Sequence, residues 1–236
     1  DITEEDRQFV LDNINALMDL PQPLTASDII AERCGVRPLA VRGDSGTADW
    51  LTLSRKHAID QTTEDAYLSI YGGKLTDCLN VGEEVAAALQ DCGIDFPYLQ
   101  QPWYGEPPDA VRDEFFHQAE LMQLDAMTDH RASEPLSRRL WRRYGLNAIE
   151  LLDQIRQDPR QAEILIQHSE YLRCELHYVA EKEIVTKLED FLRRRSKISQ
   201  VVRRETIENS PGLLEACQIL FGDQAEARLQ EWQSCK

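Results

Sequence analysis

From residue 110 to the C-terminus the sequence carries helical spacing only, and no other feature constrains the fold as strongly. Apolar residues recur three or four positions apart in each segment, which is typical of helices with one buried face. Pro135 and Pro211 stand near helix starts, where proline is tolerated. No repeat of fixed period is present. We therefore predict a bundle-like, all-α C-terminal domain over residues 101–236. The predicted helical segments are 110–127, 134–145, 147–159, 170–183, 186–198, 212–222 and 223–235.

The first hundred residues mix helices with short strands, which predicts an α+β arrangement. A helix is expected at 3–18, where Thr3 can cap the N-terminus and acidic residues follow it. The proline-rich segment 94–109 has no apolar period and marks the predicted domain boundary. The remaining predicted elements are strands at 35–41, 54–60 and 66–72, and a helix at 75–93.

Composition excludes several classes of protein. The 236 residues carry a formal net charge of −16, so no nucleic-acid partner is expected, because the phosphate backbone would be repelled. No apolar run approaches the length of a membrane span. The six cysteines are irregularly spaced, which indicates free thiols in a reducing compartment. The sequence begins with Asp1, which indicates a fragment or a processed product.

The stretch Gly72-Gly73-Lys74-Leu75-Thr76 follows a predicted strand and precedes a predicted helix. Glycine lacks a Cβ and lets the backbone approach a ligand closely. Lys74, together with Arg37 and Arg55, lies at or beside a predicted strand end, where small-ligand sites form in α/β domains. Three such cations could hold a small phosphorylated substrate, although spacing alone favours the alternative that they are solvated charges beside strands.

Common cofactor motifs are missing from the chain. It has neither the G-x-x-x-x-G-K-[ST] phosphate loop nor the G-x-G-x-x-G dinucleotide turn. His177 and Glu181 are four residues apart on a predicted helix, but a single pair of this kind is normally a surface contact, so no metal site is predicted.

Basic residues concentrate in the segment 191–204. Acidic residues precede them on the same predicted helix, and this charge order complements the helix dipole. A structural role is therefore the default interpretation. The alternative is a non-catalytic interaction module, in which this run docks on a membrane, a protein partner or nucleic acid. A smaller basic patch at 138–145 contains Trp141, which we expect to lie in the core rather than to stack on an arginine.

Several segments together resemble the C-terminal portion of the FAD-dependent, quinone-linked aerobic glycerol-3-phosphate dehydrogenases. Their order along nearly the whole chain makes the resemblance specific. The segments are GVRPLAV (35–41), LSRKHAID (53–60), LSIYGGKLT (68–76), RLWRRYGLNAIELL (139–152) and EYLRCELHYVAEKEIVTKLEDFLRRRSKI (170–198).

The resemblance implies a fold, a reaction and a set of site residues. Residues 1–100 would be the last strands and helices of a DAO-like FAD- and substrate-binding domain. Gly72, Gly73, Lys74, Leu75 and Thr76 would approach the FAD isoalloxazine. Arg37, Arg55 and Lys74 would hold glycerol 3-phosphate while hydride passes from its C2 to flavin N5, giving dihydroxyacetone phosphate. Electrons would pass to quinone, which implies a cytoplasmic enzyme peripheral to the inner membrane.

The chain departs from the family pattern in two ways. The family commonly continues Thr-Tyr-Arg after GGKLT, whereas this chain continues Asp77-Cys78-Leu79. The family's dinucleotide-binding half is absent from the sequence, so we expect the chain alone to be inactive. Neither the electron acceptor, quinone or oxygen, nor the oligomeric state follows from the sequence; a homodimer is one alternative.

Overall fold

The computed structural model of the chain describes residues 2–35, 56–62, 67–98 and 107–235. These residues divide between two compact units, one formed by 1–33 with 105–236 and the other by 34–104. The predicted strand at 35–41 falls almost wholly outside the described residues. The predicted boundary near residue 100 stays a prediction.

Helix α1 (Glu4–Leu17) begins as the sequence predicts. Thr3 Oγ1 accepts a hydrogen bond from the Asp6 amide, and Asp6 Oδ2 accepts one from the Thr3 amide, which forms a capping box. A short 3₁₀ helix follows at Ala26–Asp28, where Ser27 O accepts a hydrogen bond from Arg203 Nη2 at 2.7 Å.

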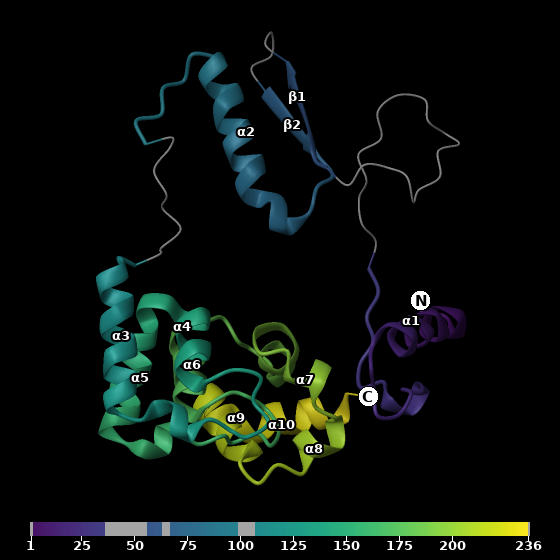
Figure 1. Cartoon of the computed structure of the whole chain (residues 1–236), viewed down its shortest axis with the longest axis vertical. Helices are drawn as coiled ribbons and strands as arrows, with labels where there is room; N and C mark the ends of the chain where they lie inside the picture. Colours follow the sequence, from purple (N-terminus) through teal and green to yellow (C-terminus); the bar gives the residue numbers. More distant parts are fainter. Residues whose placement is uncertain (1, 36–55, 63–66, 99–106, 236) are drawn as a thin grey trace. The chain divides into compact units, whose positions relative to one another are not determined.

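The smaller unit is a β-hairpin followed by a helix (Figure 1). Strand β1 (Ala58–Thr62) pairs antiparallel with β2 (Tyr67–Tyr71), so the predicted strand pair is confirmed, although β1 ends two residues later than expected. A 3₁₀ turn at Leu75–Asp77 leads into α2 (Cys78–Asp91). Gln61 Nε2 donates to Cys92 Sγ at 2.8 Å, which holds one face of the hairpin toward the end of α2.

Helices form the rest of the described chain (Figure 1). Two buried apolar clusters hold them together, one centred on α3 to α5 with the start of α6, the other on α6 to α10. No helix of the described residues has the length and apolarity needed to cross a membrane. The helices are α3 (Asp109–Leu121), α4 (Leu136–Tyr144), α5 (Ala148–Gln157), α6 (Arg173–Lys182), α7 (Ile198–Val201), α8 (Arg204–Glu208), α9 (Leu213–Phe221) and α10 (Ala225–Ser234).

Two predicted helices differ from the observed ones. The segment 110–127 breaks after Leu121, because Gln123 takes a left-handed conformation with φ 51° and the turn that follows buries Leu124 completely. The segment 186–198 forms a π-helical stretch, Asp190–Arg195. The Ser196 amide donates to Phe191 O five residues earlier, and the wider turn places both Phe191 and Leu192 in the core.

Candidate functional site

The turn between β2 and α2 holds five of the residues predicted for the site. Gly72 and Gly73 have φ of 65° and 82°, a conformation that side chains with a Cβ rarely adopt. Lys74 is exposed, and no described residue forms a hydrogen bond or an ion pair with its ammonium. Leu75 is 92% exposed and Thr76 is also exposed. This turn therefore combines two residues without a Cβ, a cation with no partner among the described residues, and an exposed apolar side chain.

Arg37 and Arg55, the other two predicted site residues, lie outside the described residues. Their convergence with Lys74 is neither shown nor contradicted and stays a prediction.

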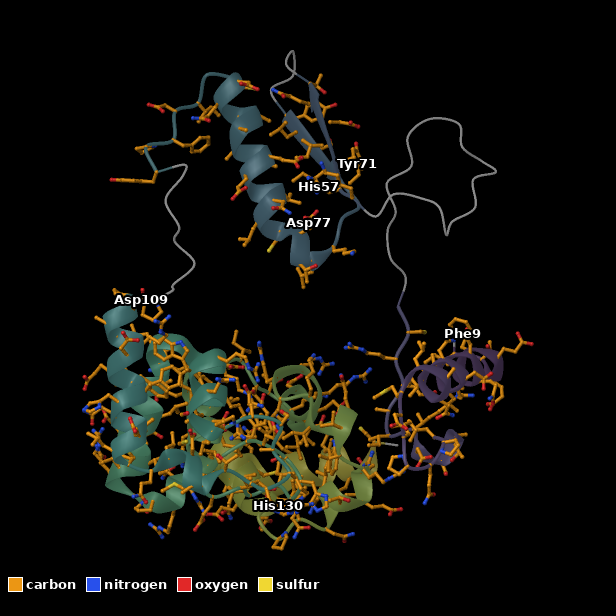
Figure 2. All side chains as sticks on the ribbon, viewed as in Figure 1. Phe9, His57, Tyr71, Asp77, Asp109 and His130 are labelled. Atoms are coloured by element: carbon orange, nitrogen blue, oxygen red, sulfur yellow. The ribbon has the colours of Figure 1, made fainter. Side chains whose placement is uncertain are left out.

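The side chain that anchors this turn, His57, was missed by sequence reasoning. Its ring is 1% exposed, and Nδ1 lies 2.7 Å from Asp77 Oδ2 while Nε2 lies 2.9 Å from Glu84 Oε2. Figure 2 shows His57 and Asp77 at the end of the unit where β2 passes into α2. A Cβ on Gly73 would stand 2.9 Å from His57 Cβ, so only glycine allows the turn to pack this closely on the histidine.

Hydrogen bonding to the two carboxylates determines the electrostatics of this cluster. The hydrogen bonds that the His57 ring donates to Asp77 and then to Glu84 raise the pKa of His57 above its ordinary value. The hydrogen bond to His57 lowers the pKa of Asp77, and a hydrogen bond from Asn80 lowers it further. The other hydrogen bond of His57 lowers the pKa of Glu84. These shifts favour an imidazolium between two carboxylates.

A signal for His57 exists in the sequence, although it is weak. Asp77 and Glu84 are seven residues apart at the start of a helix, which places them on one face two turns apart. An isolated histidine at the start of an apolar strand is a natural partner for such a pair. The spacings of 20 and 27 residues give no local pattern that would have identified it.

The basic run is mostly neutralised within the helical unit. Its arginines pair with carboxylates on the same or neighbouring segments, and Arg204 also lies over the Trp232 ring at 4.6 Å. These contacts favour the structural role and give no observation in favour of a docking patch, which stays a prediction. The ion pairs are Arg193 with Glu189 at 3.7 Å, Arg194 with Asp190 at 2.6 Å, Arg195 with Glu183 at 3.2 Å and Arg204 with Glu208 at 2.7 Å.

Trp141, in the smaller basic patch, is half-buried and packs against the apolar cluster of α3 to α5, close to the predicted core position. Its ring centroid lies 5.3 Å from that of Phe115, at the contact between α3 and α4.

The all-α domain that follows the hairpin unit matches a known domain family. Residues 113–227 match the family described as the C-terminal domain of alpha-glycerophosphate oxidase. The resemblance predicted from the sequence is thereby confirmed.

Curated proteins with similar sequences include glycerol-3-phosphate dehydrogenases. That of Pseudomonas aeruginosa is 30% identical over 206 residues, which are 84% of this chain and 37% of the relative. Glycerol-3-phosphate dehydrogenase 2 of Mycobacterium bovis is 32% identical over 84% of this chain and 32% of its own length. The aerobic enzyme of Staphylococcus aureus is 28% identical over 82% and 34%. The chain thus spans about a third of the length of the curated relatives it matches and corresponds to their C-terminal part.

Proposed function

We propose that this chain forms the C-terminal part of an FAD-dependent sn-glycerol-3-phosphate dehydrogenase. The observation that carries the proposal is the turn of half-buried Gly72 and Gly73 with exposed Lys74. It offers close backbone approach beside a cation that has no partner among the described residues. The names of the relatives supply the substrate class, because those proteins act on glycerol 3-phosphate. Residues 1–100 would then be the end of a DAO-like FAD- and substrate-binding domain.

The turn fits both a flavin edge and a phosphate. Without a Cβ at Gly72 or Gly73, the backbone can approach a flat ring, and the exposed side chains of Leu75 and Thr76 extend the same surface. The Lys74 ammonium can neutralise one charge of a phosphate as a compact point charge. Arg37 and Arg55 are proposed to complete the phosphate clamp with bidentate hydrogen bonds.

Holding the phosphate fixes the position of the substrate carbon that reacts. Anchoring the charged end of glycerol 3-phosphate at Lys74 would orient C2 and its hydrogen, which lowers the entropy lost on reaching the reactive geometry. The chemistry that bound FAD supplies is acceptance of that hydride, so that dihydroxyacetone phosphate is formed. The electrons would then pass to quinone in a membrane, which the parent enzyme would contact peripherally. Because this turn is only part of a flavin site, we expect no turnover by the chain alone.

A chimera tests the proposal directly. The chain would replace the matching C-terminal part of the Pseudomonas aeruginosa relative, and the product would be assayed for bound flavin and for glycerol 3-phosphate oxidation with a quinone analogue or oxygen. We expect a flavin-bearing chimera to turn over. Lys74→Ala should lower kcat/KM by about 30- to 160-fold, because a charged hydrogen bond is worth about 2–3 kcal/mol. Lys182→Ala, which removes an exposed lysine of α6, is the matched control.

Either of two results would count against this function. One is a chimera that carries flavin and shows no oxidation of glycerol 3-phosphate. The other is a Lys74→Ala chimera whose kcat/KM equals that of Lys182→Ala. Comparison of quinone analogue with oxygen also identifies the acceptor.

A further inference from the structure

His57 is unusual within the hairpin–helix unit. Among residues 34–35, 56–62 and 67–98, it is the one residue that is buried, at 6% exposed, although the unit contains many apolar residues. Burial of a titratable ring requires compensation by hydrogen bonds, because an unpaired polar group loses its solvation. Here both ring nitrogens have partners, and these partners lie in the segment that follows the Gly72–Thr76 turn.

We propose that His57 is the positioning residue of the Gly72–Thr76 turn, and that it holds the turn through Asp77 and Glu84 only while its imidazole is protonated. The positioning follows from contacts within this unit. The consequence for substrate binding rests on the proposed function.

The geometry requires a proton on each ring nitrogen. A neutral imidazole has one N–H donor and one lone pair, whereas an imidazolium has two donors. Asp77 Oδ2 and Glu84 Oε2, both ionised acceptors, lie at 2.7 Å and 2.9 Å from the two nitrogens. Loss of the proton would therefore turn one of the two hydrogen bonds into a repulsion between lone pairs.

The neighbouring charges do not replace this proton. Asp77 and Glu84 face the ring from α2 and the turn before it, and Lys56, next to His57 in the chain, pairs with Glu84 Oε1 at 3.4 Å. The Lys56 charge also lowers the pKa of Asp77, but its side chain is 68% exposed, so solvent screens this interaction. The hydrogen bond that Asp77 accepts from Asn80 Nδ2 is local to the helix start and does not reach the hairpin.

The turn would respond because it is tied to the histidine at two points. Gly73 packs on His57, and Asp77, three residues after Lys74, is bonded to the ring. The stabilisation by His57 is complete below its ordinary pKa of about 6.5 and is lost as pH rises through the raised pKa of the folded state. Above that point Lys74 should lose its fixed position, and the affinity of the turn for an anion should fall.

The test is a pH titration of the intact chain by NMR, from about pH 5 to about pH 9, which spans histidine titration. The signals of the His57 ring and of the Gly72, Gly73 and Lys74 amides would be followed together. We expect one shared midpoint above the ordinary histidine pKa. The midpoint should fall in Asp77→Asn and in Glu84→Gln. The amide transition should vanish in His57→Gln and persist in His130→Gln, whose exposed ring belongs to the helical unit.

Amides of the turn that stay constant while His57 titrates would overturn the proposal, as would unchanged midpoints in both acid variants. These two acid variants keep the test decisive if His57→Gln fails to fold. A second titration with glycerol 3-phosphate, at the two ends of the pH range, separates this inference from the proposed function. Absence of binding at either pH would count against the proposed function alone. Binding that weakens several-fold at the higher pH in the parent chain, but not in His57→Gln, would support both the function and the inference.

Discussion

Glu175 shows how a single buried side chain organises the helical unit. Its carboxylate is fully buried, yet it accepts hydrogen bonds from Arg143 Nη1 at 2.9 Å, the Tyr144 hydroxyl at 2.9 Å and the Leu172 amide at 2.8 Å. Arg139, 2% exposed, lies 3.6 Å from the same carboxylate. Burial, with the nearby Glu175 charge, raises the pKa of Tyr144 far above its ordinary value. This network joins α4 to the start of α6.

Removing the charge of Glu175 should destabilise the chain strongly. Glu175→Gln keeps the size of the side chain but removes the counter-charge that faces the buried Arg139, and leaves Arg143 with Glu170 alone. Breaking a buried ion pair in this way costs about 3–5 kcal/mol, so we expect a loss of about 3 kcal/mol in the free energy of unfolding. Urea unfolding followed by far-UV circular dichroism measures it.

Glu181→Gln is the control, because this carboxylate lies on the same helix with 64% of its side chain exposed. Its free energy of unfolding should stay within about 0.5 kcal/mol of the parent. Equal losses in the free energy of unfolding for the two substitutions would mean that the buried network does not stabilise the chain more than an exposed carboxylate does.

The sequence could not have placed this network. The segment 138–145 reads as a basic patch, because charged residues are almost always exposed and a pattern of residue types does not identify a partner 32 residues away. Arg139 is instead in the core, and burial lowers its pKa from the ordinary arginine value. Sequence reasoning placed Trp141 nearer its observed position, because an aromatic ring tends to bury a large apolar area, and Trp141 is half-buried against the core cluster.

At the scale of elements, hydrophobic periodicity predicted the helices that bury one apolar face. It did not predict the local breaks that tertiary packing causes. Helices α1, α2, α5 and α9 lie within their predicted segments with caps close to the expected residues. The π-helical stretch and the break after Leu121 have no signal of this kind. Both occur because a particular side chain, Phe191 or Leu124, must reach the core.

Packing between elements is close where α9 begins. A Cβ on Gly212 would lie 2.6 Å from Leu165 O and 2.9 Å from Leu165 Cα, and both are backbone atoms that cannot move independently. We expect Gly212→Ala to lower the free energy of unfolding by about 1–3 kcal/mol, as other overpacked core positions do. Chemical denaturation of the chain is the measurement.

Gln218→Ala serves as the comparison, because Gln218 is exposed on the same helix and alanine is a better helix former. This variant should be neutral or slightly more stable than the parent. A Gly212→Ala chain as stable as Gln218→Ala would show that α9 can shift away from Leu165 without loss of stability.

At the scale of the whole molecule, the two units have different characters. The helical unit has two apolar clusters of its own, whereas α2 buries none of its residues and the hairpin exposes Tyr67, Ile70 and Tyr71 by half or more. A three-element unit with this much exposed apolar surface is typical of a piece of a larger sheet domain. This supports the proposed place of the unit at the end of an FAD- and substrate-binding domain.

The candidate site was only partly predictable for the same reason. The Gly-Gly-Lys turn is continuous in sequence, so its residues could be named before the structure was known. The histidine that anchors it is bound through contacts between separate elements, and only three-dimensional placement brings these together. Arg37 and Arg55 remain predictions that rest on the family resemblance.

One measurement tests the central claim most directly, that the Gly72–Thr76 turn is part of a glycerol 3-phosphate site. Glycerol 3-phosphate would be added to the isotope-labelled chain near neutral pH while backbone amide shifts are followed. The account predicts saturable shifts at Gly72, Gly73 and Lys74 that are lost in Lys74→Ala and kept in Lys182→Ala. Shifts confined to residues 193–204, or shifts at the turn that survive Lys74→Ala, would contradict it.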